Sequence, residues 1–233
     1  MNKLAVITGG TRGIGRALVE RFAQGGCDVI TCGRHATEHQ SWSRELAQLT
    51  GVSVEILQAD LSNRQGVKVL SDAVSSARRP VDVLINNAGY FLPGPMLTEG
   101  EGELEKLLQA NLLSAYYLTK DLQEPVRLAR GHIFNICSIA SIQAYPSGGS
   151  YSVTKFALLG FSKSLREELK NSNVRVTAVL PGATLTDSWS GVDLPEERFM
   201  PPDDIAETIW SAWKLSGRSV VEEIVIRPQL GDI

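Results

Sequence analysis

The chain has 233 residues, of which 43% are apolar, and its formal net charge is −3. This length suits one α/β domain, because such domains often run past roughly 200 residues without dividing. The charge excludes the basic excess of a nucleic-acid-binding protein, and no apolar run reaches the length of about 18 residues needed to span a membrane.

Short apolar runs alternate with longer helical patterns along the chain. The strand candidates are nearly continuous in apolar residues, as expected for strands covered on both faces. They lie at residues 3–8, 27–32, 53–58, 81–86, 131–137, 174–180 and 219–226. The helical patterns lie at residues 14–25, 42–50, 63–78, 103–122, 150–171 and 203–216. This alternation predicts a single domain over 1–233, an α/β doubly wound parallel sheet of about seven strands (a Rossmann fold) with helices on both faces.

Three local features refine this prediction. Ser62-x-x-Gln65 resembles a capping box at a helix start. Pro125 is expected to end or kink the long central helix. The one long irregular stretch, at about 182–202, is predicted to be a substrate loop, because long loops in compact domains are usually functional.

The sequence also predicts the compartment of the protein and whether it binds a metal. The three cysteines, Cys27, Cys32 and Cys137, stand in apolar segments, which is typical of reduced thiols in a reducing compartment. No Cys-x-x-Cys spacing occurs and the chain has only three histidines, so we expect no metal site. The apolar run that opens the chain is too short for a secretory signal, so we expect a cytoplasmic protein.

A glycine-rich segment, Thr8-Gly9-Gly10-Thr11-Arg12-Gly13-Ile14-Gly15, joins the first predicted strand to the first predicted helix. Gly9 allows a tight turn, Gly13 leaves room for a pyrophosphate, and Gly15 lets helix and strand pack closely. The helix N-terminus would direct its free N–H groups at the phosphates. This context predicts a dinucleotide site. The alternative is a glycine-rich turn that binds no ligand.

The end of the second strand, Thr31-Cys32-Gly33-Arg34, indicates which dinucleotide is bound. Enzymes that prefer the unphosphorylated cofactor usually have an acid here, but no Asp or Glu occurs before Glu38. An arginine attracts and forks onto a 2′-phosphate that a carboxylate would repel. Arg34, with Arg12 as a second cation, therefore predicts NADP(H). The alternative is two solvated arginines.

A second set of polar residues predicts proton transfer. Tyr151 and Lys155 are four residues apart on a predicted helix and share a face. A phenol has a pKa near 10, and a nearby ammonium group is expected to lower it. Tyr151 would then exchange a proton with a carbonyl oxygen as hydride is transferred, and Ser138 would stabilise charge on that oxygen. Taken alone, such a Tyr-Lys pair is more often surface decoration and such a serine a turn former.

Together these motifs resemble the short-chain dehydrogenase/reductase family over nearly the whole chain. The resemblance implies that Ser138, Tyr151 and Lys155 carry the chemistry, while Asn111 holds a water that links the lysine to solvent. It also implies that Lys155 binds the nicotinamide ribose. The residues expected at the cofactor are Gly9, Thr11, Arg12, Gly13, Ile14, Gly15, Arg34, Asp60, Leu61, Asn87, Ala88, Gly89, Tyr151, Lys155, Pro181, Gly182, Thr184 and Thr186.

Some of these roles rest mainly on the resemblance. Asp60 is expected to accept a hydrogen bond from the adenine amino group, or alternatively to help open the next helix. The backbone after Pro181-Gly182, near Thr184, is expected to bind the carboxamide, with help from Thr186. Thr184 stands where a branched aliphatic residue is common in the family, so the expectation concerns its backbone rather than its side chain.

The expected substrate residues are Ser138, Tyr145, Tyr151 and Trp189, within walls at residues 90–92, 139–145 and 185–200. Their apolar and aromatic surface suits a flat or apolar carbonyl compound; alternatively these residues only pack the loop. The C-terminal stretch at 220–233 resembles the bacterial sepiapterin-reductase branch of the family. This resemblance implies a pterin side-chain ketone such as sepiapterin, with Asp187 or Asp232 pairing with the amino-pyrimidine edge.

The sequence thus predicts an NADP-dependent carbonyl reductase acting on a small molecule. The alternatives are a 3-oxoacyl-thioester reductase, another alcohol dehydrogenase, and a non-enzymatic dinucleotide-sensing binding protein. The helices at 103–122 and 150–171 are apolar on more than one face, which predicts self-association. The family resemblance implies a homodimer or homotetramer.

Overall fold

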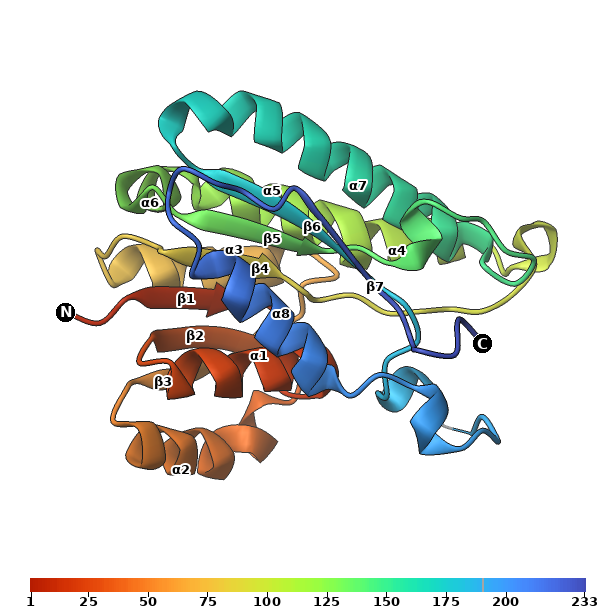
Figure 1. Cartoon of the computed structure of the whole chain (residues 1–233), viewed down its shortest axis with the longest axis horizontal. Coiled ribbons are helices and arrows are strands. Elements are labelled where there is room, and N and C mark those ends of the chain that lie inside the picture. Colours follow the sequence, from red (N-terminus) through yellow and green to blue (C-terminus); the bar gives the residue numbers. More distant parts are fainter. Residues whose placement is uncertain (190) are drawn as a thin grey trace.

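The computed structural model describes residues 1–189 and 191–233. Seven strands form one sheet in the order β3-β2-β1-β4-β5-β6-β7, and all neighbouring strands are parallel (Figure 1). The doubly wound Rossmann fold predicted above is therefore confirmed. The strands are β1 (Leu4–Ile7), β2 (Asp28–Gly33), β3 (Val54–Gln58), β4 (Val83–Asn86), β5 (His132–Ile136), β6 (Arg175–Pro181) and β7 (Glu223–Ile226).

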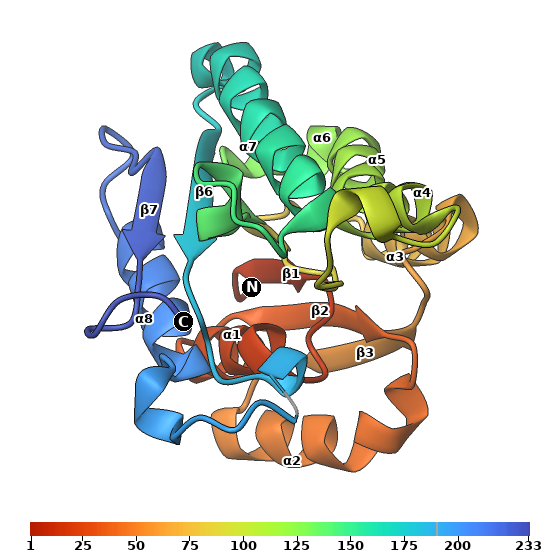
Figure 2. The ribbon, with the colours of Figure 1, turned by 90° about the vertical axis from the view of Figure 1, so that its right-hand side faces the viewer.

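Helices cover both faces of the sheet, as Figure 2 shows from the carboxyl ends of the strands. Alternate strand residues point to opposite faces: Ala5 and Ile7 pack toward α1, α2 and α8, whereas Leu4 and Val6 pack toward α3, α5, α6 and α7. This two-sided burial explains the nearly continuous apolar strands. The helices are α1 (Gly13–Gln24), α2 (Gln40–Thr50), α3 (Arg64–Ser76), α4 (Glu103–Leu108), α5 (Ser114–Asp121), α6 (Gln123–Ala129), α7 (Gly149–Leu169) and α8 (Pro202–Trp213).

The expected single helix at 103–122 is interrupted. A π-helical turn over Gln109–Leu113 separates α4 from α5. The helix then stops at Leu122, whose backbone leaves the α region, and α6 follows directly. Pro125 does not make this break: it lies in the first turn of α6, where a missing N–H costs little because first-turn N–H groups have no intrahelical partner.

The predicted capping box at Ser62 is wrong. The cap of α3 is Asn63, whose side chain accepts a 2.9 Å hydrogen bond from the N–H of Gly66. The Ser62 N–H instead donates to Asp60 Oδ1 at 3.0 Å. The aspartate therefore closes a local turn, which places the helix start one residue later.

The predicted substrate loop leaves β6 and returns at the start of α8. At its base, the Leu185 N–H donates to the Met200 carbonyl at 2.9 Å, and the Met200 N–H donates to the Ala183 carbonyl at 3.0 Å.

In the described part of the chain, no helix is both long enough and apolar enough to cross a membrane. The three cysteines are buried free thiols, as expected.

Candidate active site

The glycine loop lies between β1 and α1 and has the shape that a pyrophosphate requires. Gly9 and Gly13 adopt positive φ angles of 67° and 52°, which favour glycine. A Cβ on Gly15 would lie 2.1 Å from the Gly9 carbonyl oxygen, so this position admits no side chain. No side chain caps α1, and its first turn holds no acidic residue. Its N–H groups are thus available to an anion, which fits a dinucleotide phosphate.

Three polar side chains hold this loop in place. The Asn87 amide donates to the Thr8 carbonyl at 2.8 Å, and the Thr8 hydroxyl accepts 2.8 Å bonds from the N–H groups of Asn87 and Ala88. Thr31 accepts a 3.0 Å bond from the Gly10 N–H. Thr8 and Thr31 were not predicted to support the loop, although polar residues within apolar strands are a usable signal.

The candidate 2′-phosphate ligands lie at the exposed edge of this loop. Arg34 is exposed at the end of β2, where Gly33 fits closely against Thr11. Arg12 is also exposed, but its guanidinium pairs with Asp187 of the substrate loop at 2.9 Å. The expected second cation is thus shared with a carboxylate. Asp60 is exposed and Leu61 is buried after β3.

The candidate catalytic residues lie just after β5 and in the first two turns of α7. Ser138 follows β5, and its Oγ accepts a 3.1 Å bond from the Ala140 N–H, which leaves the hydroxyl hydrogen free to be donated. The Ser138 hydroxyl also lies near enough to the Tyr151 phenol to favour its charged form and so to oppose the rise of its pKa. Lys155 is 6% exposed, its Nζ donates to the Ile136 carbonyl at 2.8 Å, and this nitrogen lies 5.6 Å from the Tyr151 ring centre.

The electrostatics correct one expectation. Burial raises the pKa of Tyr151 to about 12, and the Ser138 hydroxyl only partly opposes this. Burial likewise lowers the pKa of Lys155 to about 8. In the protein without its cofactor, the expectation that Lys155 lowers the pKa of Tyr151 is therefore wrong. Desolvation disfavours both the phenolate and the ammonium group. At neutral pH the phenol is protonated and can act as an acid.

Asn111 lies within the π-helical turn and is 1% exposed. Its amide donates to the Tyr90 carbonyl and the Thr154 hydroxyl, both at 3.1 Å. Its side-chain oxygen accepts a 2.9 Å bond from the Tyr90 N–H. The side chain thus fixes the segment after β4, next to Gly89, and the expected water contact remains a prediction. π-Turns are frequent at functional sites.

Aromatic rings form the substrate side of the site. Phe91 stands edge-on to Tyr151 with ring centres 4.9 Å apart, and it lies 6.5 Å from Trp189. Trp189 in turn contacts Phe199 at 5.2 Å. Tyr145 is 38% exposed, and burial raises its pKa to about 12, with a smaller contribution from the Tyr151 charge. Phe91 thus connects Tyr151 to the predicted substrate loop.

The segment after Pro181 lies over the glycine loop. The hydroxyl of buried Thr184 donates to the Gly182 carbonyl at 3.1 Å. A Cβ on Gly13 would lie 3.0 Å from the Thr186 methyl group. Asp187 pairs with Arg12 and Asp232 pairs with Arg227, so both candidate pterin carboxylates already have cationic partners.

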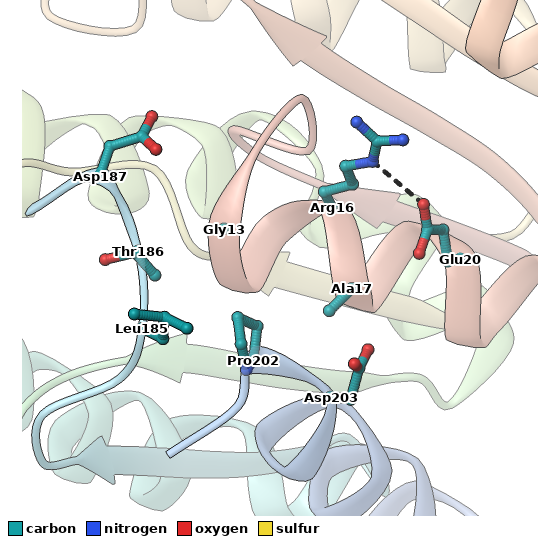
Figure 3. Close-up of a pocket in the computed structure, with 9 residues that line it drawn as sticks. All are labelled: Gly13, Arg16, Ala17, Glu20, Leu185, Thr186, Asp187, Pro202 and Asp203. Atoms are coloured by element: carbon teal, nitrogen blue, oxygen red, sulfur yellow. Dashed lines mark hydrogen bonds and ion pairs between the residues drawn. The ribbon is translucent and has the colours of Figure 1, made fainter. Parts of the chain in front are cut away.

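A hollow of about 260 Å³ separates α1 from the substrate loop (Figure 3). It is lined by residues of α1 and of the segments after β6 and before α8, and not by Ser138, Tyr151 or Lys155. Its lining residues are Gly13, Arg16, Ala17, Glu20, Leu185, Thr186, Asp187, Pro202 and Asp203.

Comparisons with known proteins agree with this geometry. A family model described as short chain dehydrogenase matches residues 3–196. The sepiapterin reductase of Chlorobaculum tepidum is 32% identical, with 100% of this chain and 99% of that protein covered. The 3-oxoacyl-(acyl-carrier-protein) reductase of Aquifex aeolicus is 30% identical, with 89% and 88% covered.

A solved structure extends the likeness to the fold. The alcohol dehydrogenase of Thermococcus sibiricus, complexed with 5-hydroxy-NADP, superposes with a TM-score of 0.92 at 29% identity, and the match covers 98% of this chain and 97% of that one. Its sheet and helices therefore follow the same path. The chain belongs to the short-chain dehydrogenase family and is an oxidoreductase with a Rossmann fold.

Proposed function

We propose that this protein reduces a ketone to a secondary alcohol with NADPH. The observation that carries the proposal is the convergence of the Ser138 hydroxyl and the protonated Tyr151 phenol beside buried Lys155. Together these groups provide one hydrogen-bond donor and one acid for the same carbonyl oxygen. They stand at the carboxyl ends of the strands, where open α/β sheets place their ligands.

The residues divide the chemistry as follows. NADPH, when bound, supplies the hydride that reaches the carbonyl carbon. Ser138 donates a hydrogen bond to the carbonyl oxygen, and Tyr151 transfers its phenolic proton to that oxygen as negative charge develops there. Lys155 uses one N–H on Ile136, and its remaining hydrogens would hold the ribose hydroxyls. A protonated Tyr151 is the form that the reductive step needs.

The cofactor preference rests on charge at the edge of the glycine loop. Exposed Arg34 would bind the 2′-phosphate, and Arg12 would add a second positive charge. Gly33 stands where an acid would otherwise select NADH. Relatives of known structure support this choice: the archaeal alcohol dehydrogenase was solved with 5-hydroxy-NADP, and the L-sorbose reductase of Gluconobacter frateurii with NADPH.

The substrate class that we propose is a flat heterocycle with a side-chain ketone, such as sepiapterin. Phe91, Tyr151 and Trp189 offer aromatic faces, and offset or edge-to-face stacking on such faces stabilises a flat ring. The sepiapterin reductase match includes the C-terminal segment. A pterin that paired with Asp187 would have to displace Arg12 from it.

A 3-oxoacyl thioester is the second candidate, supported by the Aquifex aeolicus relative at 30% identity. Purified protein should be mixed with NADPH or NADH and with sepiapterin, a 3-oxoacyl thioester or a simple ketone. We expect loss of NADPH absorbance, fastest with sepiapterin. Faster turnover of the thioester would replace the pterin proposal. A protein that binds NADPH but does not oxidise it with any of these substrates would be a dinucleotide sensor.

We also propose that the protein forms a homodimer or homotetramer in the cytoplasm. Tyr116 on α5 and Val153 and Phe156 on α7 are more than 40% exposed, which is unusual for large apolar side chains gathered on neighbouring helices. An apolar hollow of about 420 Å³ lies beside Val153 and Phe156. Analytical ultracentrifugation should give twice or four times the chain mass, and a monomer would contradict this proposal.

A further inference from the structure

The catalytic helix α7 begins without a cap of its own. Its N-cap residue is Gly148, no N-cap side chain bonds to its first turn, and that turn contains no acidic residue. Gly148 and Gly149 are also poor helix formers, because glycine loses the most conformational freedom on folding. Tyr151 is the third residue of the helix. The turn most prone to fraying is therefore the turn that carries the phenol.

Glu99, in the loop between β4 and α4, supplies this cap from a distant part of the chain. Its Oε1 accepts a 2.8 Å hydrogen bond from the Ser150 N–H, across a separation of 51 residues. A carboxylate at a helix N-terminus is also favoured by the helix dipole. Gly149 makes the approach possible: its φ is +44°, and a Cβ there would lie 2.0 Å from the same oxygen.

The same loop contacts the active site at two further points. The Gly94 N–H donates to the Ser147 carbonyl at 3.0 Å, just before α7 begins. Phe91 stands edge-on to the Tyr151 ring, with ring centres 4.9 Å apart. The loop thus touches the segment before the helix, its first turn and the catalytic ring. Glu99 is the charged contact among the three.

We propose that Glu99 is a positioning residue for Tyr151: its carboxylate caps the first turn of α7 and so holds the phenol at the oxygen that receives the proton. This inference rests on the proposed function. Glu99 acts through the backbone N–H of Ser150 and not through the phenol itself. Its loss therefore affects the chemical step more than the binding of cofactor or substrate. A displaced acid and a lost cap together predict a fall in kcat of about tenfold.

The test compares Glu99→Ala with Glu99→Gln and with Glu101→Ala. Glutamine keeps an oxygen that can accept from the Ser150 N–H, and Glu101 is an exposed glutamate two residues away. Each variant is assayed for kcat, KM and amide hydrogen exchange over residues 145–156. For Glu99→Ala we expect faster exchange in the first turn, a kcat lowered about tenfold, and KM values within about a factor of two. Glu99→Gln should recover most of kcat, and Glu101→Ala should match the wild type.

Several outcomes would overturn the inference. Glu99→Ala with wild-type kcat would overturn it even if exchange became faster, and so would unchanged exchange. Failure of Glu99→Gln to recover kcat would show that the hydrogen bond is not the cause. A wild-type protein that reduces no ketone would refute the proposed function instead, and the exchange measurements would then test the cap by themselves.

Discussion

Burial of the charged Lys155 side chain lowers the free energy of unfolding, and a single substitution should remove this destabilisation. This side chain is buried, and burial lowers its pKa from 10.5 to about 8. At neutral pH the folded protein therefore holds a cation that has lost its hydration. Methionine has a similar length and no charge. Lys155→Met should thus make the protein more stable at neutral pH while removing an amine that the proposed reaction needs.

The size and sign of this effect follow from the two pKa values. Below pH 8 both states bind the proton, and the full cost is present. Between pH 8 and 10.5 the unfolded chain keeps a proton that the folded chain has released, so wild-type stability rises with pH. A tenfold change in proton affinity is worth about 1.4 kcal/mol, which gives roughly 3 kcal/mol at pH 7. Loss of the hydrogen bond to Ile136 offsets about 1 kcal/mol of this, so the net gain is about 2 kcal/mol.

Urea unfolding of both proteins at two pH values measures this cost. The difference in unfolding free energy between variant and wild type should fall by about 2 kcal/mol between about pH 7 and pH 9.5. Other titrating groups are common to both proteins and cancel from the difference. A difference that stays constant to within about 0.5 kcal/mol would show that Lys155 titrates as an ordinary exposed lysine, and would refute the reasoning.

Three further predictions test other parts of the site. Tyr151→Phe should lower kcat by about 10² to 10⁴ fold while the dissociation constant for NADPH, measured by fluorescence titration, stays within about a factor of two; wild-type turnover would remove Tyr151 as the acid. Arg34→Asp should weaken NADPH binding at least about tenfold more than NADH binding, and an unchanged ratio would exclude Arg34 from the site. Gly15→Ala should cost about 1–3 kcal/mol of unfolding free energy, because its Cβ would meet the Gly9 carbonyl oxygen at 2.1 Å. The matched control, Gly160→Ala, meets nothing within 4 Å and should be neutral or stabilising in the same urea titration.

The strands and most helices could be predicted because their signal is local. Apolar runs mark the strands covered on both faces, and the glycine spacing marks the turn into α1. The interruption at Gln109–Leu113 gives no such signal, because its residues suit an α-helix equally well. Pro125 was predicted to break the helix but occupies a first turn, where proline is tolerated. A residue type alone does not show which turn of a helix it will occupy.

Sequence spacing predicts which residues lie together in the candidate site, but it does not predict their electrostatics. Spacing places Tyr151 and Lys155 on one helix face, yet their pKa values depend on burial by segments distant in sequence. The same limit applies to Arg12, whose partner Asp187 lies 175 residues away. Glu99 was missed for this reason too, since its contact with Ser150 exists only after the loop that follows β4 has met the first turn of α7.

The base of the substrate loop has a consequence for how such an enzyme could be remodelled. The paired backbone bonds among Ala183, Leu185 and Met200 close the loop at its root, while β6 and α8 continue into the core on either side. The two ends of this loop are thus held at a fixed separation, and the residues between them form an exchangeable segment. If this segment is the substrate loop, replacing its part after Asp187 should change what the enzyme accepts while keeping Thr186 and Asp187 against the glycine loop. New specificities could therefore be grafted onto this scaffold by exchanging that one segment.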